Sequence, residues 1–422
     1  MIQAIKTINI RLSKLVQIDL NYLMRGGTFL SLTQITSALF GFLLTIAFAR
    51  YLPQDIYGTY RYVLAAYTLL IIASLPGLDT AVLETLSKGN QGAFTHAIKT
   101  KFIYGFIGTA LSWVYGIYHL YTGDITLFWL FILIGVFLPC IECLSLYTAL
   151  LNSQRRFGVW AITEIANQLF STAALFISIY FTDNIFIIVT AYFIPYILVR
   201  LVATLYCFKK YISNTEYDPD YLSYGKVMTW YQIITRGIAS VDQMVLFHVM
   251  GPAQVAIFSI ATAIPQRFQS ILKITGTLAF PKYANRSEED IKKYLPKKMI
   301  AFGLIILTVC FAYASIAPYF FKIFFPKYLA SVPYSQLAIL FTLSGLTYPF
   351  GAYLSAHKKV KENYIFAIIS FAVKVTCLII LVPLYGIWGA IWGIVLSSWS
   401  TIAATFYLIY KKPNKTESPT LY

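Results

Sequence analysis

The sequence is poor in charged residues, and acidic residues are half as common as basic ones. Asp, Glu, Lys and Arg together make up 12% of the 422 residues, whereas hydrophobic residues make up 58% and the mean hydropathy is +0.68. A soluble domain typically carries about 25% charged residues. This composition excludes an ordinary soluble protein and indicates a chain that lies largely within a membrane.

Histidine and cysteine are also scarce, and neither forms a convincing metal-binding pattern. The four histidines are isolated from one another along the chain, and no glycine-rich, lysine-containing nucleotide loop is present. Cys140 and Cys143 have metal-motif spacing, but no second pair and no histidine lies near them. Buried cysteines usually pack as small hydrophobic residues. We therefore expect no metal, no cofactor, no disulfide and no enzymatic activity.

Long apolar segments account for most of the chain. A helix that crosses the hydrocarbon layer needs about 20 mostly apolar residues. The sequence contains twelve such stretches, at 27–49, 60–80, 101–121, 126–150, 159–181, 185–206, 227–249, 254–279, 299–320, 332–354, 364–383 and 387–410. Because no region of soluble-domain size lies outside them, we expect an all-α integral membrane protein with twelve transmembrane helices.

The basic residues are concentrated on one side of the predicted membrane. With the N-terminus placed in the cytoplasm, the inward segments contain 24 Lys and Arg residues, and the outward segments contain only Arg50, Arg61, Lys322 and Lys327. This is the positive-inside bias of a membrane protein with many spans. The net charge of +16 therefore indicates topology rather than nucleic-acid binding. We expect both termini on the cytoplasmic side of a plasma membrane.

An internal repeat divides the chain into two halves. The polar and basic stretch Leu151–Phe157 returns in similar form at Leu354–Val360, six predicted spans later. Repeats separated by six spans have the same orientation in the membrane, an arrangement typical of transporters. We expect two pseudo-symmetric six-helix lobes around a central cavity. The predicted boundaries are an amphipathic N-terminal segment at 1–25, an N-lobe at 26–208, a cytoplasmic linker at 209–225, a C-lobe at 226–410 and a cytoplasmic tail at 411–422.

Four cations lie inside the predicted spans of the second half. Arg236, Arg267 and Lys374 fall at about the same depth, and Lys273 follows about 9 Å further toward the cytoplasm. A charge near the bilayer centre costs at least about 2.5 kcal/mol, so it usually faces a cavity, a partner or a substrate. Arginine can meet phosphate or carboxylate oxygens with two parallel hydrogen bonds. We expect these four residues to bind an anionic head group.

Acidic residues in the spans leave other interpretations open. Asp242 is an alternative partner that would neutralise Arg236 or Arg267 within the protein. In the first half, Glu142 and Arg200 lie at depths that allow a structural ion pair. A functional alternative is that Glu142 or Asp242 binds a coupling proton or sodium ion.

Three further arginines lie near the ends of predicted spans. Arg25 is at the cytoplasmic end of the first span, and Arg50 and Arg61 are at the outer ends of the first two. Such residues can take up or release a phosphate group, but they also interact with lipid head groups. Both roles remain open for these three residues.

A set of short motifs occurs in order at the ends of the predicted spans. They are Ala49-Arg50-Tyr51-Leu52, Tyr57-Gly58-Thr59-Tyr60, Gly77-Leu78-Asp79, Gly251-Pro252, Phe280-Pro281-Lys282 and Leu381–Ala390. Over essentially the whole chain, this ordered set resembles the polysaccharide flippases of the multidrug/oligosaccharidyl-lipid/polysaccharide (MOP) exporter superfamily, the Wzx-type O-antigen and capsule translocases. After Gly251-Pro252 that family usually has Gly, any residue and Tyr, whereas this chain has Ala256-Ile257-Phe258, which keeps a small residue and an aromatic one.

The resemblance implies a fold like that of the multidrug (MATE) exporters and a specific transport activity. The implied activity is movement of an undecaprenyl-diphosphate-linked oligosaccharide from the cytoplasmic to the outer leaflet of a bacterial plasma membrane, by alternating access. The implied partners are this lipid-linked substrate, the membrane lipids, a polysaccharide polymerase and a chain-length regulator.

Two rival functions are less compatible with the sequence. A cation-coupled drug exporter of the same superfamily would require unpaired acids in its cavity, whereas the excess charge at the middle of the spans is basic. A membrane-embedded polysaccharide polymerase or ligase would require a sizeable outward loop with catalytic residues, and the predicted outward loops are short.

Overall fold

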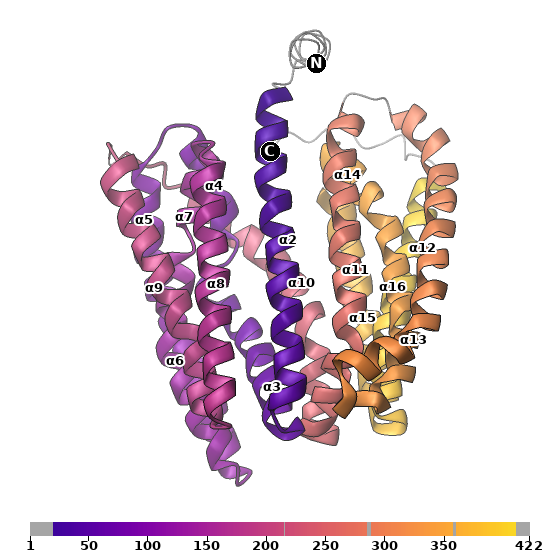
Figure 1. Ribbon diagram of the computed structural model, residues 1–422. Coiled ribbons are helices and arrows are strands. Elements are labelled where there is room, and N and C mark those ends of the chain that lie inside the picture. Colours follow the sequence, from indigo (N-terminus) through magenta and orange to yellow (C-terminus); the bar gives the residue numbers. More distant parts are fainter. Residues whose placement is uncertain (1–19, 215, 285–287, 358–359, 411–422) are drawn as a thin grey trace, which may run out of the picture. The chain divides into compact units, whose positions relative to one another are not determined.

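The computed structural model describes residues 20–214, 216–284, 288–357 and 360–410, and within these residues every regular element is a helix. The expected all-α fold class is therefore confirmed (Figure 1). In chain order the elements are α2 (Leu20–Tyr51), α3 (Gln54–Leu70), η1 (Ile71–Ser74), α4 (Leu78–Ser87), α5 (Gly92–Tyr121), α6 (Ile125–Leu144), α7 (Tyr147–Ser153), α8 (Phe157–Phe181), α9 (Ile185–Tyr211), α10 (Tyr221–Met250), α11 (Pro252–Ala284), α12 (Glu288–Phe324), η2 (Pro326–Ser331), α13 (Val332–Ala338), η3 (Ile339–Thr347), α14 (Tyr348–Ala356), α15 (Val360–Tyr385) and α16 (Ile387–Tyr410).

Eleven helical segments in the described part of the chain are long and apolar enough to cross a membrane. They overlap eleven of the twelve predicted spans, and the remaining prediction, 101–121, lies in α5. That helix is 30 residues long, but it carries Lys101, Ser112 and His119 among its apolar residues. These polar side chains lower its average hydropathy, although all three are buried. The protein is a multi-pass membrane protein.

Some predicted spans are interrupted rather than continuous. The span predicted at 60–80 ends in η1, where Leu75 has a φ of 55° and Pro76 follows before α4 begins. The span predicted at 332–354 is divided into α13, η3 and α14. In the first of these, the break places Asp79 in the opening turn of α4.

The chain forms two compact units, and their boundary does not follow the linear halves. Unit 1 contains the described residues up to Ile56 together with Ala66–Ile233, and unit 2 contains Tyr57–Ala65 together with the described residues from Ile234 onward. Each of α3 and α10 therefore contributes to both units. Helix α9 ends at Tyr211 and α10 begins at Tyr221, so the segment between these helices falls within the linker predicted at 209–225.

Each unit has its own buried apolar core. In unit 1, α4, α5 and α7 pack together through Val82, Phe94, Leu150 and other buried side chains. In unit 2, α10, α11, α15 and α16 pack around Leu246, Phe258 and Ile391. These two cores fix the helices that carry the charged residues discussed next.

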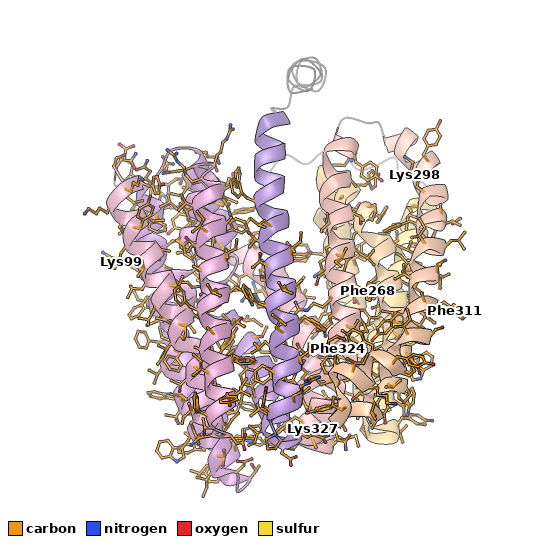
Figure 2. The ribbon with its side chains drawn as sticks, viewed as in Figure 1. Lys99, Phe268, Lys298, Phe311, Phe324 and Lys327 are labelled. Carbon is orange, nitrogen blue, oxygen red and sulfur yellow. The ribbon has the colours of Figure 1, made fainter. Side chains whose placement is uncertain are left out.

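Large apolar side chains also cover the outer faces of the helices, as a lipid environment requires. In unit 2, Phe311 on α12 is 78% exposed and points away from its helix (Figure 2). Lys298 and Lys327 lie toward opposite ends of the same unit, with apolar residues between them. A belt of apolar side chains with charges toward the ends is typical of membrane-spanning helices.

The predicted terminal segments fall mainly outside the described residues. This applies to residues 1–19 of the amphipathic segment and to the tail at 411–422.

Candidate anion site

Unit 2 contains an arginine that is held in place by a buried glutamine. Arg61 belongs to the segment of α3 that packs in unit 2, and Gln243 lies on α10. With the Gln243 amide oriented so that both of its groups have partners, its nitrogen donates a hydrogen bond to the Arg61 carbonyl at 3.1 Å and its oxygen accepts one from Arg61 Nη2 at 2.8 Å. Gln243 is only 6% exposed. The guanidinium of Arg61 is therefore oriented by a protein contact and is not free to move like a surface side chain.

A second arginine lies within the electrostatic reach of the first. Arg267 on α11 is half-buried, and its charge interacts unfavourably with that of Arg61. Tyr57, which is 3% exposed, lies in the field of both arginines. Two like charges brought together in a low-dielectric region repel each other unless an anion lies between them or beside them. The pair therefore has the electrostatic character of an anion-binding site.

No carboxylate neutralises these arginines in the part of the chain that the structure describes. Neither Arg61, Arg236 nor Arg267 has an acidic side chain within ion-pair distance there, and the buried Arg61 Nε has no hydrogen-bond partner. Arg236 is half-buried on α10, seven residues before Gln243. Seven residues are close to two helical turns, so Arg236 lies on the same face of α10, about 10.5 Å along the axis.

Lys374, which was predicted to share this site, has a different environment. Its side chain is 4% exposed, and Nζ lies 3.0 Å from Oδ2 of Asp242 and also donates to the Ile238 carbonyl. The other carboxylate oxygen, Oδ1, accepts a hydrogen bond from the Gln243 backbone N–H at 3.1 Å. Asp242 therefore neutralises Lys374, and among the described residues it forms no ion pair with Arg236 or Arg267.

The remaining predicted cations are spread along the chain. Lys273 is exposed on α11, six residues after Arg267. Arg50 is exposed at the last turn of α2. Arg25 lies in α2, but its side chain is outside the described residues.

Unit 1 contains a buried charge cluster that was not predicted from the sequence. Lys101 on α5 has no exposed surface, and its Nζ lies 2.7 Å from Asp79 Oδ1, 3.6 Å from Glu142 Oε2 and 3.3 Å from Ser145 Oγ. Among the described residues Glu142 makes its ion pair with Lys101 rather than with Arg200, although the charges of Glu142 and Arg200 still interact at longer range. The sequence signal for this cluster is that Lys101 is the first residue of the span predicted at 101–121.

Arg200 makes its two printed hydrogen bonds to neutral groups, and its buried Nε has no hydrogen-bond partner among the described residues. Its Nη1 donates to the Ile141 carbonyl at 3.1 Å and its Nη2 to the Tyr196 hydroxyl at 3.0 Å, and the guanidinium lies 4.2 Å from the centre of the Tyr196 ring. Nearby, the Tyr147 hydroxyl donates to Glu164 at 2.6 Å. These contacts hold unit 1 together internally.

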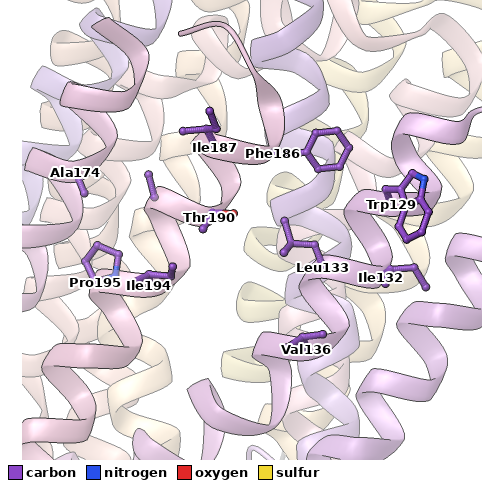
Figure 3. A pocket seen from close by; sticks show the side chains of 11 residues that line it. Trp129, Ile132, Leu133, Val136, Ala174, Phe186, Ile187, Thr190, Ile194 and Pro195 are labelled. Carbon is purple, nitrogen blue, oxygen red and sulfur yellow. The ribbon is translucent and has the colours of Figure 1, made fainter. Parts of the chain in front are cut away.

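Unit 1 also has an apolar groove of about 770 Å³ (Figure 3). Its wall consists mainly of side chains from α6 and α9, including Trp129, Leu133, Phe186 and Ile194, with Ala174 from α8. No charged side chain lines it, and Thr190 provides the only side-chain hydroxyl. This groove is unsuited to an anion. Among the described residues, no group of three or more His, Cys, Asp or Glu is placed to hold a metal ion.

Comparison with known proteins identifies relatives at the level of family and fold. The family model described as "Polysaccharide biosynthesis protein" matches residues 23–229 and 221–419. A search of curated protein sequences finds no significant match. The fold is similar to that of "Lipid II flippase MurJ, inward closed conformation", with a TM-score of 0.71 and 14% identity over 91% of this chain and 87% of that one.

Multidrug transporters share the same fold. The "MATE multidrug transporter DinF-BH" has a TM-score of 0.62 and 12% identity, over 93% of this chain and 95% of that one. An inward-facing MATE transporter of the MOP superfamily has a TM-score of 0.58 and 12% identity, over 89% and 93% of the two chains. The resemblance inferred from the span-end motifs is confirmed.

Proposed function

We propose that this chain, which belongs to the polysaccharide biosynthesis protein family, translocates undecaprenyl-diphosphate-linked oligosaccharide repeat units across the bacterial plasma membrane. The observation that carries the proposal is the arginine pair of unit 2, Arg61 and Arg267, which has no acidic counter-ion among the described residues. A flippase for a lipid diphosphate needs such a site, because the diphosphate must leave water to cross the membrane. The fold shared with a protein named as a lipid II flippase supports the same function.

In this proposal the arginines replace the hydration shell of the diphosphate. Arg61, oriented by Gln243, and Arg267 bind phosphate oxygens through charge-assisted hydrogen bonds, which are stronger than neutral ones. Arg236 extends the positive face along α10, and exposed Lys273 provides an earlier contact on α11. The polyprenyl tail stays in the lipid while the carrier alternates between inward-open and outward-open states.

The proposed setting is the plasma membrane, with both termini in the cytoplasm. The distribution of basic residues along the sequence supports this orientation. Arg25 and Arg50 contact lipid head groups or the phosphate during uptake and release. The product is passed to a polysaccharide polymerase and its chain-length regulator, for O-antigen, capsule or exopolysaccharide synthesis.

The test is complementation of a strain that lacks this gene. Arg61→Gln, Arg267→Gln and the double variant should each reduce surface polysaccharide by at least roughly tenfold, since a hydrogen bond to a charged group contributes about 1.5 to 3 kcal/mol. Lys322→Gln, which removes an exposed cation from α12 of the same unit, should leave the polymer at the wild-type level. Full surface polymer in the arginine variants, at normal protein level, would refute the site.

A drug exporter of the same superfamily is the alternative, and its requirement for a free acid is poorly met. Asp242 is paired with Lys374, and both Asp79 and Glu142 contact Lys101. Resistance to cationic dyes that is lost in Asp242→Asn, with no change in surface polymer, would favour the exporter over the flippase.

A further inference from the structure

We infer that Lys374 serves the proposed anion site indirectly, by neutralising Asp242 so that this carboxylate does not cancel the positive field of Arg61 and Arg267. Lys374 is then a positioning residue, whose effect on the substrate passes through another side chain. The inference rests on the proposed function, since it concerns the same anionic head group.

The Asp242 carboxylate lies next in sequence to the glutamine that orients Arg61. Asp242 is 4% exposed and directly precedes Gln243, the residue whose side chain holds Arg61. A buried carboxylate next in sequence to the glutamine that contacts Arg61 is a competitor for any phosphate bound there, because it offers the same oxygen ligands without having to be brought into the membrane.

Both carboxylate oxygens of Asp242 already have partners within the protein. Oδ2 lies 3.0 Å from Lys374 Nζ, and Oδ1 accepts the Gln243 backbone N–H at 3.1 Å. The ammonium also donates to the Ile238 carbonyl, one turn before Asp242, which fixes it on the side of α10 that faces α15. Both oxygens of Asp242 thus have partners other than the arginines, and the charges of Asp242 and Lys374 sum to zero.

Lys374 is too enclosed to contact the substrate directly. Its side chain is 4% exposed and its ammonium already makes two contacts within the protein. By comparison, Arg267 is half-buried and has no acidic partner among the described residues. The two roles predict opposite results when Asp242 is neutralised together with Lys374.

The experiment uses the full-length protein in lipid nanodiscs and measures binding of undecaprenyl diphosphate, with undecaprenol as a neutral probe. Lys374→Met should weaken diphosphate binding by at least roughly tenfold, because it leaves an unpaired buried carboxylate beside the site. Asp242→Asn should bind as tightly as the wild type or tighter. The double variant Lys374→Met/Asp242→Asn should recover affinity to within about threefold of the wild type. Undecaprenol binding should be the same in all of them.

Controls separate this role from a purely structural one. Tyr313→Phe removes a buried hydrogen bond of unit 2, from the Tyr313 hydroxyl to Ser335 at 2.7 Å, without changing any charge. It should lower thermal stability but leave diphosphate affinity unchanged. A double variant that stays as weak as Lys374→Met would overturn the inference and indicate direct contact, and equal loss of undecaprenol binding would overturn it in favour of a packing role.

The same series of variants distinguishes failure of the proposed function from failure of the role inferred for Lys374. If Arg267→Gln binds undecaprenyl diphosphate as the wild type does, the anion site itself is wrong. If Arg267→Gln is weak and Lys374→Met is unaffected, the site stands and only the role of Lys374 is wrong.

Discussion

Lys101 donates a hydrogen bond from α5 to Asp79 at the start of α4 across 2.7 Å, although the lysine side chain has no exposed surface. Glu142 on α6 approaches the same ammonium at 3.6 Å. One buried cation thus joins three helices of unit 1. Glu142 depends on it most, because its side chain is 8% exposed and would otherwise be a charge with little access to water, whereas the Asp79 side chain is 34% exposed.

Lys101→Met should therefore be strongly destabilising. Removing one partner of a buried ion pair costs about 3 to 5 kcal/mol, since the remaining charge is left uncompensated. The measurement is the thermal unfolding midpoint of the purified protein in detergent, together with the yield of monodisperse protein. Adding Asp79→Asn and Glu142→Gln to the variant should restore part of the loss.

Lys88→Met is the matched control. Lys88 pairs with Glu84 at 2.8 Å, but the two side chains are 67% and 53% exposed. An exposed pair contributes at most about 1 kcal/mol, so the unfolding midpoint should hardly change. Equal destabilisation by the two lysine variants would contradict the importance given to burial.

The fold class was accessible from the sequence, whereas the partners of the buried charges were not. Spans are encoded locally, in runs of about 20 apolar residues. The contact between Arg61 and Gln243 joins residues far apart in the chain, and it arises because part of α3 packs in unit 2. No local sequence pattern predicts such a contact.

Helix geometry explains why Asp242 does not pair with Arg236. Arg236 and Asp242 are six residues apart, so their side chains point about 120° apart around α10 and cannot easily pair. Ile238 and Asp242 are four residues apart and share a face, and this is the face that receives Lys374. By contrast, the sequence alone does not show that Lys374 is the residue that contacts this face.

Gly58→Ala should destabilise unit 2 severely. The segment of α3 around Gly58 packs so closely on the start of α11 that a Cβ atom would lie 1.8 Å from the Pro252 carbonyl oxygen. Backbone atoms would have to move to relieve this overlap, and overpacking typically costs about 1 to 3 kcal/mol or more. Unfolding midpoint and surface polysaccharide should both fall.

Gly351→Ala on α14 should be neutral or slightly stabilising, because no atom lies within 4 Å of the added Cβ and alanine favours the helix. Equal unfolding midpoints of the Gly58→Ala and Gly351→Ala variants would contradict the close approach of Gly58 to Pro252.

Gln243→Leu should weaken the anion site without removing any of its charges. Leucine is similar in size but can neither donate to the Arg61 carbonyl nor accept from Nη2, so the guanidinium loses its orientation. Binding of undecaprenyl diphosphate should fall by roughly fivefold to tenfold, less than in Arg61→Gln.

Gln336→Leu provides the comparison, since Gln336 donates to the Ala314 carbonyl at 2.8 Å elsewhere in unit 2. Its affinity for the diphosphate should match the wild type; a loss as large as that of Gln243→Leu would mean that any buried amide of this unit has the same effect.

Tyr147→Phe should cost more stability than Tyr313→Phe, although both remove one phenolic hydroxyl from a buried tyrosine. The Tyr147 hydroxyl donates to the Glu164 carboxyl group at 2.6 Å, whereas the Tyr313 hydroxyl contacts the neutral Ser335 hydroxyl at 2.7 Å. Hydrogen bonds to charged groups contribute about 1.5 to 3 kcal/mol, and neutral ones about 0.5 to 1.5 kcal/mol. Thermal unfolding of the two variants should rank them in this order. The double variant Tyr147→Phe/Glu164→Gln should recover part of the difference, because a neutral amide tolerates the loss of its donor better than a carboxylate does. Equal losses in the two single variants, with no recovery in the double variant, would show that the charge of Glu164 does not determine the strength of this contact.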